Sequence, residues 1–293
     1  MAEAVVISGM FRSGTTLLWR TLAADPETVS PLCEPLHPDL PINAKTLKHY
    51  AEFNRYPKAM AWWSPGFHTE RLLLGPADDH PGLEKYLSEL VKDGALIKFC
   101  RMTLRLSWFV RRFPKARIIN IVRDPRAVCH SFLKIYQKPI DSPDIEWHSW
   151  YGSQYYGLYS RLEPWRDYLA GLAHQPPYVK ILALWGINAA QSMKDLSAAE
   201  PGSSITVRYE DLVGDPTGTI ERIYALLGRP VPSAVLDNAL GKNVHQLGGR
   251  NKWQQRTSGE WLEEWRKVPE GVWTRGIEKS RIGKVMEAAG YGG

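Results

Sequence analysis

A loop near the N-terminus contains the residues best suited to bind an anion. It lies between an apolar run at 4–8 and an apolar helical pattern over 14–24, with glycines at positions 9 and 14. The first turn of a helix has N–H groups without helical partners and the positive end of the helix dipole, so this order of strand, turn and helix favours a phosphate. Glycine allows those N–H groups to converge on the ligand. The residues predicted to contact the phosphate are Arg12, Ser13, Gly14, Thr15 and Thr16.

This loop differs at one position from the phosphate-binding loop of nucleoside triphosphatases. Those loops follow the pattern G-x-x-x-x-G-K-[ST], in which the lysine reaches the β- and γ-phosphates. Here Thr15 occupies the lysine position. Without that lysine a triphosphate loses its main protein cation, so we expect the loop to hold a 5′-phosphate group, with Arg12 supplying positive charge. A glycine-containing turn without a ligand is the alternative interpretation.

A second candidate anion site combines Arg123 with Ser131. Arg123 follows the apolar run 117–122, and Ser131 lies eight positions later, about two turns into the next predicted helix. The carboxyl ends of parallel strands meet at one edge of a sheet, so both anion sites would share that edge. Two such sites indicate a ligand with two separated anionic groups. In the alternative interpretation Arg123 forms a structural ion pair with Asp124 or Glu210, and Ser131 is a neutral helix position.

The hydrophobic pattern predicts a parallel sheet that would bring these residues together. Apolar runs followed by turn signals predict strands at 4–8, 28–33, 95–100, 117–122 and 204–207. Amphipathic patterns predict helices at 14–24, 83–91, 104–113, 125–136, 177–196 and 217–227. This alternation predicts an α/β fold of three layers, similar to P-loop NTPases, with a central parallel sheet of about five strands flanked by helices. We expect residues 209–212 to form a polar turn.

The 293 residues are expected to form a single domain, 1–293, because the sequence contains no internal repeat and no linker. An aromatic-rich insertion at about 141–170 is expected to be irregular or to form short helices. Three sparse cysteines without a C-x-x-C pair predict structural thiols in a reducing cytoplasm. No apolar run reaches the length of a membrane span, and residues 1–24 lack the pattern of a secretory leader.

The formal net charge of +6 indicates anionic ligands. The basic residues are not gathered in one long tract, so a nucleic-acid partner is not expected. Histidine, cysteine and carboxylate residues show no metal-ligand spacing, so no metal is expected either.

The two candidate anion motifs together resemble the PAPS-dependent sulfotransferase family, where PAPS is 3′-phosphoadenosine-5′-phosphosulfate. The motifs are Arg-Ser-Gly-Thr-Thr at 12–16 and Arg-Asp-Pro-Arg-Ala-Val at 123–128, with a serine eight residues after its first arginine. The segment 209–212, with the Asp-Pro and the helix that follow it, is also similar, so the resemblance runs from about residue 4 to 228. It implies a 5′-phosphosulfate loop at the first site and a 3′-phosphate site at the second. The implied reaction moves a sulfuryl group from PAPS to an acceptor hydroxyl, releases PAP and needs no metal.

The implied reaction also needs a general base and cations near the transferred group. Glu34 follows the predicted strand 28–33, and sulfotransferases that act on sugars or tyrosyl residues have a Glu in a similar position, so Glu34 is the predicted base. His37 competes for that role, and a plain ion pair is the alternative for Glu34. Arg12 and the loop N–H groups would stabilise charge on the leaving phosphate. Lys98 would reach the sulfonate, or else it is a solvated lysine at a strand end.

The C-terminal part, about 233–293, resembles the segment that covers the nucleotide in this family. It departs from the family's longer Arg-Lys-Gly pattern, and the predicted phosphate contacts in it are Arg250 and Lys252, with Arg256 as a further candidate. The predicted acceptor contacts are His37, Trp62, Trp150 and Tyr155. The acceptor is expected to be a hydroxyl of a small molecule or glycan. The tryptophan-rich segments lean towards a sugar, with lipid, polyketide, phenol and peptidyl tyrosine as alternatives.

Two other functions are consistent with an anion-binding loop. A P-loop kinase acting on a small molecule is disfavoured by Thr15 at the lysine position. A non-catalytic nucleotide-binding module leaves Glu34 unexplained, because a carboxylate beside a phosphate site repels its ligand.

Overall fold

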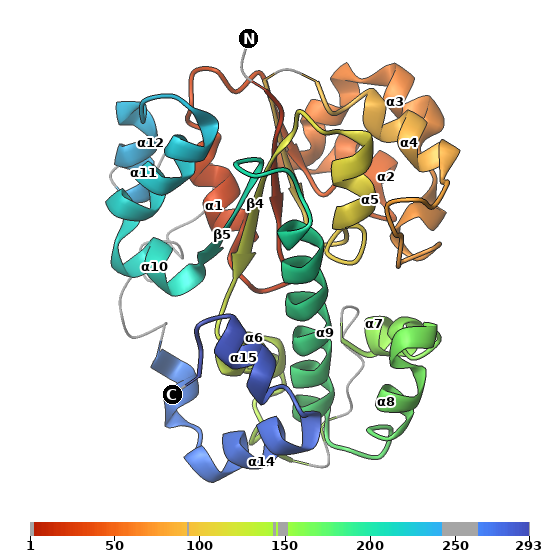
Figure 1. The fold of residues 1–293 in the computed structure, drawn as a ribbon, viewed down its shortest axis with the longest axis vertical. Helices are drawn as coiled ribbons and strands as arrows, with labels where there is room; N and C mark the ends of the chain where they lie inside the picture. Colours follow the sequence, from red (N-terminus) through yellow and green to blue (C-terminus); the bar gives the residue numbers. More distant parts are fainter. Residues whose placement is uncertain (1–2, 93, 143–144, 146–151, 242–262, 293) are drawn as a thin grey trace.

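The computed structural model describes residues 3–92, 94–142, 145, 152–241 and 263–292, and at its centre lies a five-stranded sheet (Figure 1). The strands are β1 (Val5–Ser8), β2 (Ser30–Cys33), β3 (Ala95–Phe99), β4 (Arg117–Val122) and β5 (Ser204–Arg208). Their order in the sheet is β2-β3-β1-β4-β5, and all neighbouring pairs are parallel. β1 is therefore central, with β3 on one side and β4 on the other. In such sheets ligands bind beyond the carboxyl ends of the strands, where the strand order reverses.

Helices cover both faces of the sheet, which confirms the predicted three-layer α/β fold. The α-helices in the described part of the chain are α1 (Thr15–Leu22), α2 (Leu40–Thr46), α3 (Pro57–Trp62), α4 (Pro81–Ser88), α5 (Leu106–Arg112), α6 (Pro125–Leu133), α7 (Gly152–Tyr159), α8 (Arg166–Ala170), α9 (Pro177–Ser197), α10 (Tyr209–Gly214), α11 (Pro216–Leu227), α12 (Ser233–Ala239), α14 (Glu270–Ser280) and α15 (Gly283–Ala288). Val5 and Ile7 of β1 pack with α1, α11 and α12, whereas Val6 faces α2 to α5. Successive strand residues point to opposite faces, so the three consecutive apolar residues at 5–7 of β1 bury both faces of the sheet.

A further group of helices lies beyond the carboxyl ends of the strands. Figure 1 shows α6, α14 and α15 gathered below the sheet, with α7 and α8 beside the lower half of the long helix α9. These helices share a buried apolar cluster that also includes Met10 of the loop after β1. The short helices α7 and α8 lie within the aromatic-rich insertion at 141–170, as predicted for its described residues. This helical group therefore packs directly against the edge where the candidate site residues were expected.

The loop between β1 and α1 follows a tight path. Gly14 has a φ of 92°, and a Cβ there would lie 2.2 Å from Cδ2 of Tyr209. At Gly9 a Cβ would lie 2.5 Å from the carbonyl oxygen of Ile121 in β4. Arg12 has a φ of 69°, a conformation that costs free energy in a residue with a side chain. The loop is thus held by close contact with β4 and α10.

One predicted element is wrong. Residues 209–212 do not form a turn but begin helix α10. Tyr209 and Leu212 are buried, and Tyr209 packs on Gly14. Burial of these two residues on one helical face overrides the polar character of the segment.

Further expectations concern the cysteine thiols, metal sites and membrane-spanning helices. Cys33, Cys100 and Cys129 are buried free thiols, so the prediction of structural thiols is confirmed. Among the described residues no group of three or more His, Cys, Asp or Glu side chains is placed to hold a metal ion. In the same part of the chain no helix is both long and apolar enough to cross a membrane.

We predict that Gly14→Ala lowers the free energy of unfolding by about 1–3 kcal/mol, because the new Cβ meets Tyr209 and the left-handed backbone disfavours alanine. Urea denaturation measures this change. Gly157→Ala is the matched control, since Gly157 lies within α7 and, its own helix backbone and chain neighbours aside, no atom of the described residues lies within 4 Å of its Cβ position. There alanine should add up to about 1 kcal/mol of stability through its helix propensity. Equal stability of the two variants would contradict the tight fit of the loop.

Candidate active site

The two predicted anion sites are in direct contact. Arg12 Nε donates to Ser131 Oγ over 2.9 Å, and Arg12 Nη2 reaches the carbonyl oxygen of Ser131 over 3.4 Å. Arg123 Nη1 donates to the carbonyl oxygen of Arg12 over 3.1 Å. The loop after β1 and the helix after β4 therefore present one continuous cationic region at the carboxyl edge of the sheet.

Arg123 is held in place without a carboxylate partner among the described residues. Its guanidinium carbon lies 4.4 Å from the centroid of the Tyr209 ring, and its Nε is buried with no hydrogen bond to the described part of the chain. Asp124 pairs instead with Arg126 at 2.8 Å. Glu210 accepts a hydrogen bond from the Asp124 N–H over 3.0 Å. The alternative ion pair of Arg123 with Asp124 or Glu210 is thus not what the described structure contains.

Lys98 connects the anion loop to the residue that follows β2. Its Nζ donates to Thr16 Oγ1 over 3.0 Å and lies 3.2 Å from Glu34 Oε1. Lys98 is only 6% exposed, so the alternative of a solvated lysine is wrong. A cation at this depth is stabilised by a carboxylate, and Glu34 supplies one. Lys98 therefore places positive charge beside the loop that lacks a lysine of its own.

Glu34 is buried, and each of its oxygens accepts a charged or backbone donor. Oε1 accepts from the Cys100 N–H over 2.9 Å as well as facing Lys98, and Oε2 accepts from Arg101 Nη1 over 2.9 Å. Burial alone would raise the pKa of Glu34, but the charges on Lys98 and Arg101 outweigh it and lower the pKa below its ordinary value. Glu34 also has a φ of 51°. Strain of this kind in a non-glycine residue is frequent at functional sites.

Arg101 is a site residue that the sequence analysis missed. Its side chain is 1% exposed, it binds Glu34, and its guanidinium carbon lies 5.0 Å from the centroid of the Phe11 ring. Its position in the sequence could have identified it. β3 ends at Phe99, so Arg101 follows the carboxyl end of a strand, as Glu34 and Arg123 do. Lys98, Glu34 and Arg101 together form a buried charged cluster, which we call the Glu34 cluster.

His37 lies near this cluster but is poorly arranged to take a proton. Burial, reinforced by the charge of Arg101, lowers the pKa of His37 to about 4, so the ring is neutral at pH 7. Its Nδ1 accepts the N–H of Asp39 over 3.0 Å and lies 3.1 Å from Asn43 Nδ2. Since Nδ1 is an acceptor, the ring proton resides on Nε2.

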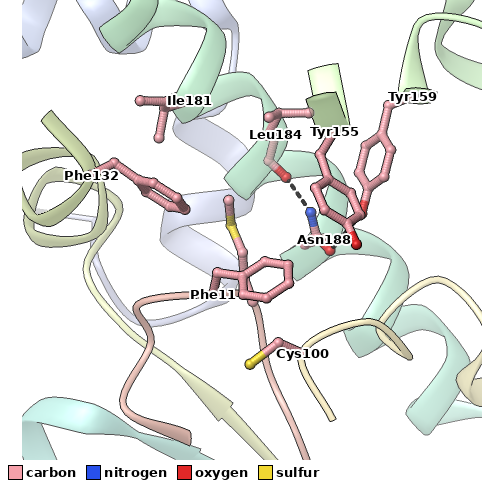
Figure 2. A pocket seen from close by; sticks show the side chains of 9 residues that line it. Phe11, Cys100, Phe132, Tyr155, Tyr159, Ile181, Leu184 and Asn188 are labelled. Atoms are coloured by element: carbon pink, nitrogen blue, oxygen red, sulfur yellow. Dashed lines mark hydrogen bonds between the residues drawn. The ribbon is translucent and has the colours of Figure 1, made fainter. Parts of the chain in front are cut away.

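A narrow pocket lies beside the Glu34 cluster (Figure 2). The loop after β1, the start of the segment after β3, and helices α6, α7 and α9 all contribute to its walls. Tyr155 is 5% exposed, and its ring centroid lies 5.4 Å from that of Phe11, so this predicted acceptor contact is brought to the site. The lining residues are Met10, Phe11, Cys100, Phe132, Tyr155, Tyr159, Ile181, Leu184 and Asn188.

Other predicted residues are placed differently. Trp62 ends α3, is 46% exposed with Lys85 over its ring, and does not line the pocket. Ser13 and Thr15 are buried, and Thr15 Oγ1 lies 3.2 Å from the Cys100 sulfur, so the Thr15 hydroxyl contacts the protein interior. Three further predicted residues, Trp150, Arg250 and Lys252, lie outside the described residues.

Comparison with known proteins identifies relatives of this chain. Residues 4–178 and 169–233 match the model of the family described as "Sulfotransferase family". Two curated relatives, the omega-hydroxy-beta-dihydromenaquinone-9 sulfotransferases Stf3 of Mycobacterium bovis and Mycobacterium tuberculosis, are each 23% identical over 271 residues. The match covers 76% of this chain, and it spans 62% of the length of each relative.

Solved structures show the same fold. The sulfotransferase domain from the curacin biosynthetic pathway superposes with a TM-score of 0.58 at 15% identity, covering 99% of this chain and 98% of that one. The sulfotransferase domain from the Synechococcus PCC 7002 olefin synthase gives a TM-score of 0.50 at 18% identity, covering 95% of this chain and 93% of that one. Because the family model spans most of the chain, including both anion motifs and Glu34, this protein belongs to the sulfotransferase family.

Proposed function

We propose that this protein transfers a sulfuryl group from PAPS to a hydroxyl group of an acceptor and releases PAP. The main observation behind the proposal is that the anion-binding residues and the Glu34 cluster are in contact at one edge of the sheet. Arg12 touches Ser131, while Thr16 of the same loop touches Lys98, which pairs with Glu34. An anion region and a buried carboxylate thus meet across one loop. Membership of the sulfotransferase family supports this class of reaction.

The donor nucleotide is proposed to bridge the two anion motifs. Arg123 and Ser131 would bind the 3′-phosphate, and the loop 12–16 would hold the 5′ end. The buried Nε of Arg123, which has no hydrogen bond in the described structure, supports a ligand at this position, since buried polar groups are normally paired. Gly14 is the N-cap residue of α1 and has no side chain to cap the first turn, which supports binding of a phosphate by the N–H groups of that turn. Arg250 and Lys252 are proposed as further phosphate contacts from the C-terminal segment.

PAPS supplies an activated sulfuryl group, and the chain has to stabilise the charge that develops on the phosphate oxygen that leaves. Arg12 and the N–H groups at the start of α1 are proposed to do so, because fixed donors stabilise developing charge without reorganisation. Lys98 is proposed to reach the transferred sulfonate or the bridging oxygen. Its contact with Thr16 supports this role, since it puts the ammonium beside the loop.

Glu34 is proposed as the general base that accepts the proton of the acceptor hydroxyl. In the described structure it is ionised and paired with two cations, which makes it a weak base. When Lys98 turns towards the sulfonate, Glu34 loses one of these partners and its pKa rises towards the range useful for proton transfer. The arrangement of His37, whose Nδ1 is already an acceptor, favours Glu34 over His37.

A P-loop kinase is the alternative enzyme. A kinase would need a cation at the Thr15 position and a free carboxylate for Mg²⁺. Thr15 is instead directed at Cys100, and Asp124 at the end of β4 is paired with Arg126. A non-catalytic nucleotide-binding module would gain nothing from a buried carboxylate near its anion loop.

The acceptor is proposed to be a small molecule that carries a hydroxyl group. The curated relatives support this class, because their name describes an omega-hydroxy-dihydromenaquinone as the molecule they act on. A glycan hydroxyl is the second class that the sequence left open.

Arg123→Ala should weaken PAP binding about 10- to 100-fold, because a charge-assisted contact to phosphate is lost. Isothermal titration calorimetry with PAP measures the dissociation constant. Arg222→Ala removes an equal charge from the exposed side of α11 and should leave PAP affinity unchanged. Unchanged affinity in the Arg123 variant would remove the 3′-phosphate assignment.

Glu34→Gln should lower kcat at least about 100-fold while PAP affinity stays within a few-fold, because a general base contributes about 10²–10⁴ in rate. A radiolabelled PAPS transfer assay gives kcat, and PAP calorimetry on the same preparation verifies that the variant is folded. Full turnover in a folded Glu34 variant would give the role of base to another group.

The same substitution should destabilise the protein in a pH-dependent manner. Removing one charge from the buried Glu34 cluster leaves two cations uncompensated, which should cost about 3–5 kcal/mol of unfolding free energy at pH 7. Since the folded pKa of Glu34 is lowered, its contribution is fully present above the unfolded value of about 4.3 and is lost as pH falls through the folded pKa. The stability difference between the variant and the parent should therefore shrink in acid.

Chemical denaturation from pH 7 to pH 3 follows this difference. Glu84→Gln is the control, because Glu84 pairs with Arg112 at the surface and should contribute less than about 1 kcal/mol. A Glu34 variant that resembles the Glu84 variant at every pH would show that the buried pairing has no net effect on stability.

A further inference from the structure

The peptide group between Arg123 and Asp124 is hydrogen-bonded on both sides by side chains from other elements. Its carbonyl oxygen accepts from Trp185 Nε1 of α9 over 2.9 Å. Its N–H donates to Glu210 Oε1 of α10 over 3.0 Å. The turn that leads from β4 into α6 is therefore fixed at the peptide that directly follows Arg123.

Tyr291, which lies just after α15, contacts both of these side chains. Its hydroxyl donates to Glu210 Oε2 over 2.7 Å. Its ring centroid lies 6.3 Å from that of Trp185, and the ring planes are inclined at 72°, an edge-to-face arrangement. Tyr291 and Trp185 are both buried. The two side chains that hold the Arg123–Asp124 peptide thus share Tyr291 as a neighbour.

Tyr291 is itself held in place from several sides. Its backbone N–H donates to the Met286 carbonyl oxygen over 2.8 Å, and the guanidinium carbon of Arg208 lies 4.5 Å from the centroid of its ring. Burial, together with the negative charge of Glu210, raises the pKa of the Tyr291 hydroxyl. The hydroxyl is therefore protonated at pH 7 and remains a donor to Glu210.

Glu210 is a potential competitor of phosphate for Arg123. It follows Tyr209, whose ring centroid lies 4.4 Å from the Arg123 guanidinium carbon, and it binds the peptide next to Arg123. A guanidinium pairs strongly with a carboxylate, and a carboxylate beside a phosphate site repels its ligand. Both oxygens of Glu210 are engaged elsewhere, one by the Asp124 N–H and the other by Tyr291. Tyr291 thus holds the carboxylate in an orientation that leaves Arg123 to other ligands.

We propose that Tyr291 is a positioning residue for the 3′-phosphate of the donor: it holds Glu210 on the Asp124 N–H, so that Arg123 keeps its place and its guanidinium stays open to phosphate. This inference rests on the proposed function, in which Arg123 binds the 3′-phosphate. Tyr291 acts through Glu210 and Trp185, not through a contact of its own with the nucleotide. It thereby favours a nucleotide that carries a 3′-phosphate over one that does not.

The affinity for PAP, compared with that for adenosine 5′-monophosphate, tests this role, because the second nucleotide lacks the 3′-phosphate. Tyr291→Phe removes the hydroxyl and keeps the buried ring, and isothermal titration calorimetry measures both affinities. We expect PAP affinity to fall about 5- to 10-fold, because a hydrogen bond to a charged group is lost and the released carboxylate competes for Arg123. The affinity for adenosine 5′-monophosphate should stay within about two-fold. An equal loss for both nucleotides, or no loss for either, would overturn the proposal.

Removal of the charge of Glu210 separates positioning from a general effect on stability. Glu210→Gln keeps an oxygen for the Asp124 N–H but cannot form an ion pair with Arg123. Combined with Tyr291→Phe, it should restore PAP affinity to within about two-fold of the parent, because the two substitutions act on the same contact and are not additive. A combined variant that binds PAP as weakly as Tyr291→Phe would contradict the role of the carboxylate.

Tyr224→Phe is the matched control. Tyr224 Oη donates to Asp25 Oδ2 over 2.5 Å, so this residue is also a buried tyrosine bound to a carboxylate, but Asp25 lies beyond the last turn of α1, away from the anion loop. The control should leave both affinities unchanged, and a loss of PAP affinity as large as that of Tyr291→Phe would overturn the proposal. A parent protein that binds PAP no more tightly than adenosine 5′-monophosphate would refute the 3′-phosphate assignment of the proposed function. A parent that prefers PAP, with a Tyr291 variant of the same preference, would refute only the role of Tyr291.

Discussion

A carboxylate buried between two cations determines how the parts of this site are joined. Glu34 leaves the end of β2, Lys98 lies in the neighbouring strand β3, and Arg101 follows that strand. Each of these charges would be costly to bury alone, so the three are stable only together. Their pairing fixes the ends of two strands relative to each other, and the contact from Lys98 to Thr16 extends this constraint to the anion loop.

The distribution of positive charge explains how the site can serve a ligand other than a triphosphate. A nucleoside triphosphatase carries its lysine within the loop, where it accompanies the β- and γ-phosphates. In this chain the loop has Arg12, which is directed at Ser131, and the ammonium group comes from β3 instead. The cations thus lie on two sides of the loop. One side faces α6, and the other faces the Glu34 cluster.

Much of this arrangement could be predicted from the sequence, because strand ends are readable from local patterns. Arg12, Glu34 and Arg123 each follow a predicted strand, and parallel strands bring their carboxyl ends to one edge. The inward position of Arg101 could not be read in this way, since it depends on Phe11 and Glu34, which are far away in the sequence.

The residues that line the pocket could also not be predicted from local sequence patterns. Its walls come from segments between Met10 and Asn188 that the fold alone brings together. The helical conformation of residues 209–212 could not be predicted for the same reason. It depends on the burial of Tyr209, which packs on Gly14 and on the Arg123 guanidinium. In these places tertiary contacts override the local sequence signal.

Phe11 and Arg12 are adjacent in the chain, yet they belong to different halves of the site. Phe11 lines the apolar pocket, and Arg12 reaches across to Ser131. The left-handed backbone at Arg12 leaves little freedom for one residue to move without the other. If a ligand in one half shifts the backbone that both residues share, thermodynamic linkage requires the effect to be reciprocal: whatever factor one ligand contributes to the affinity of a second, the second returns to the first.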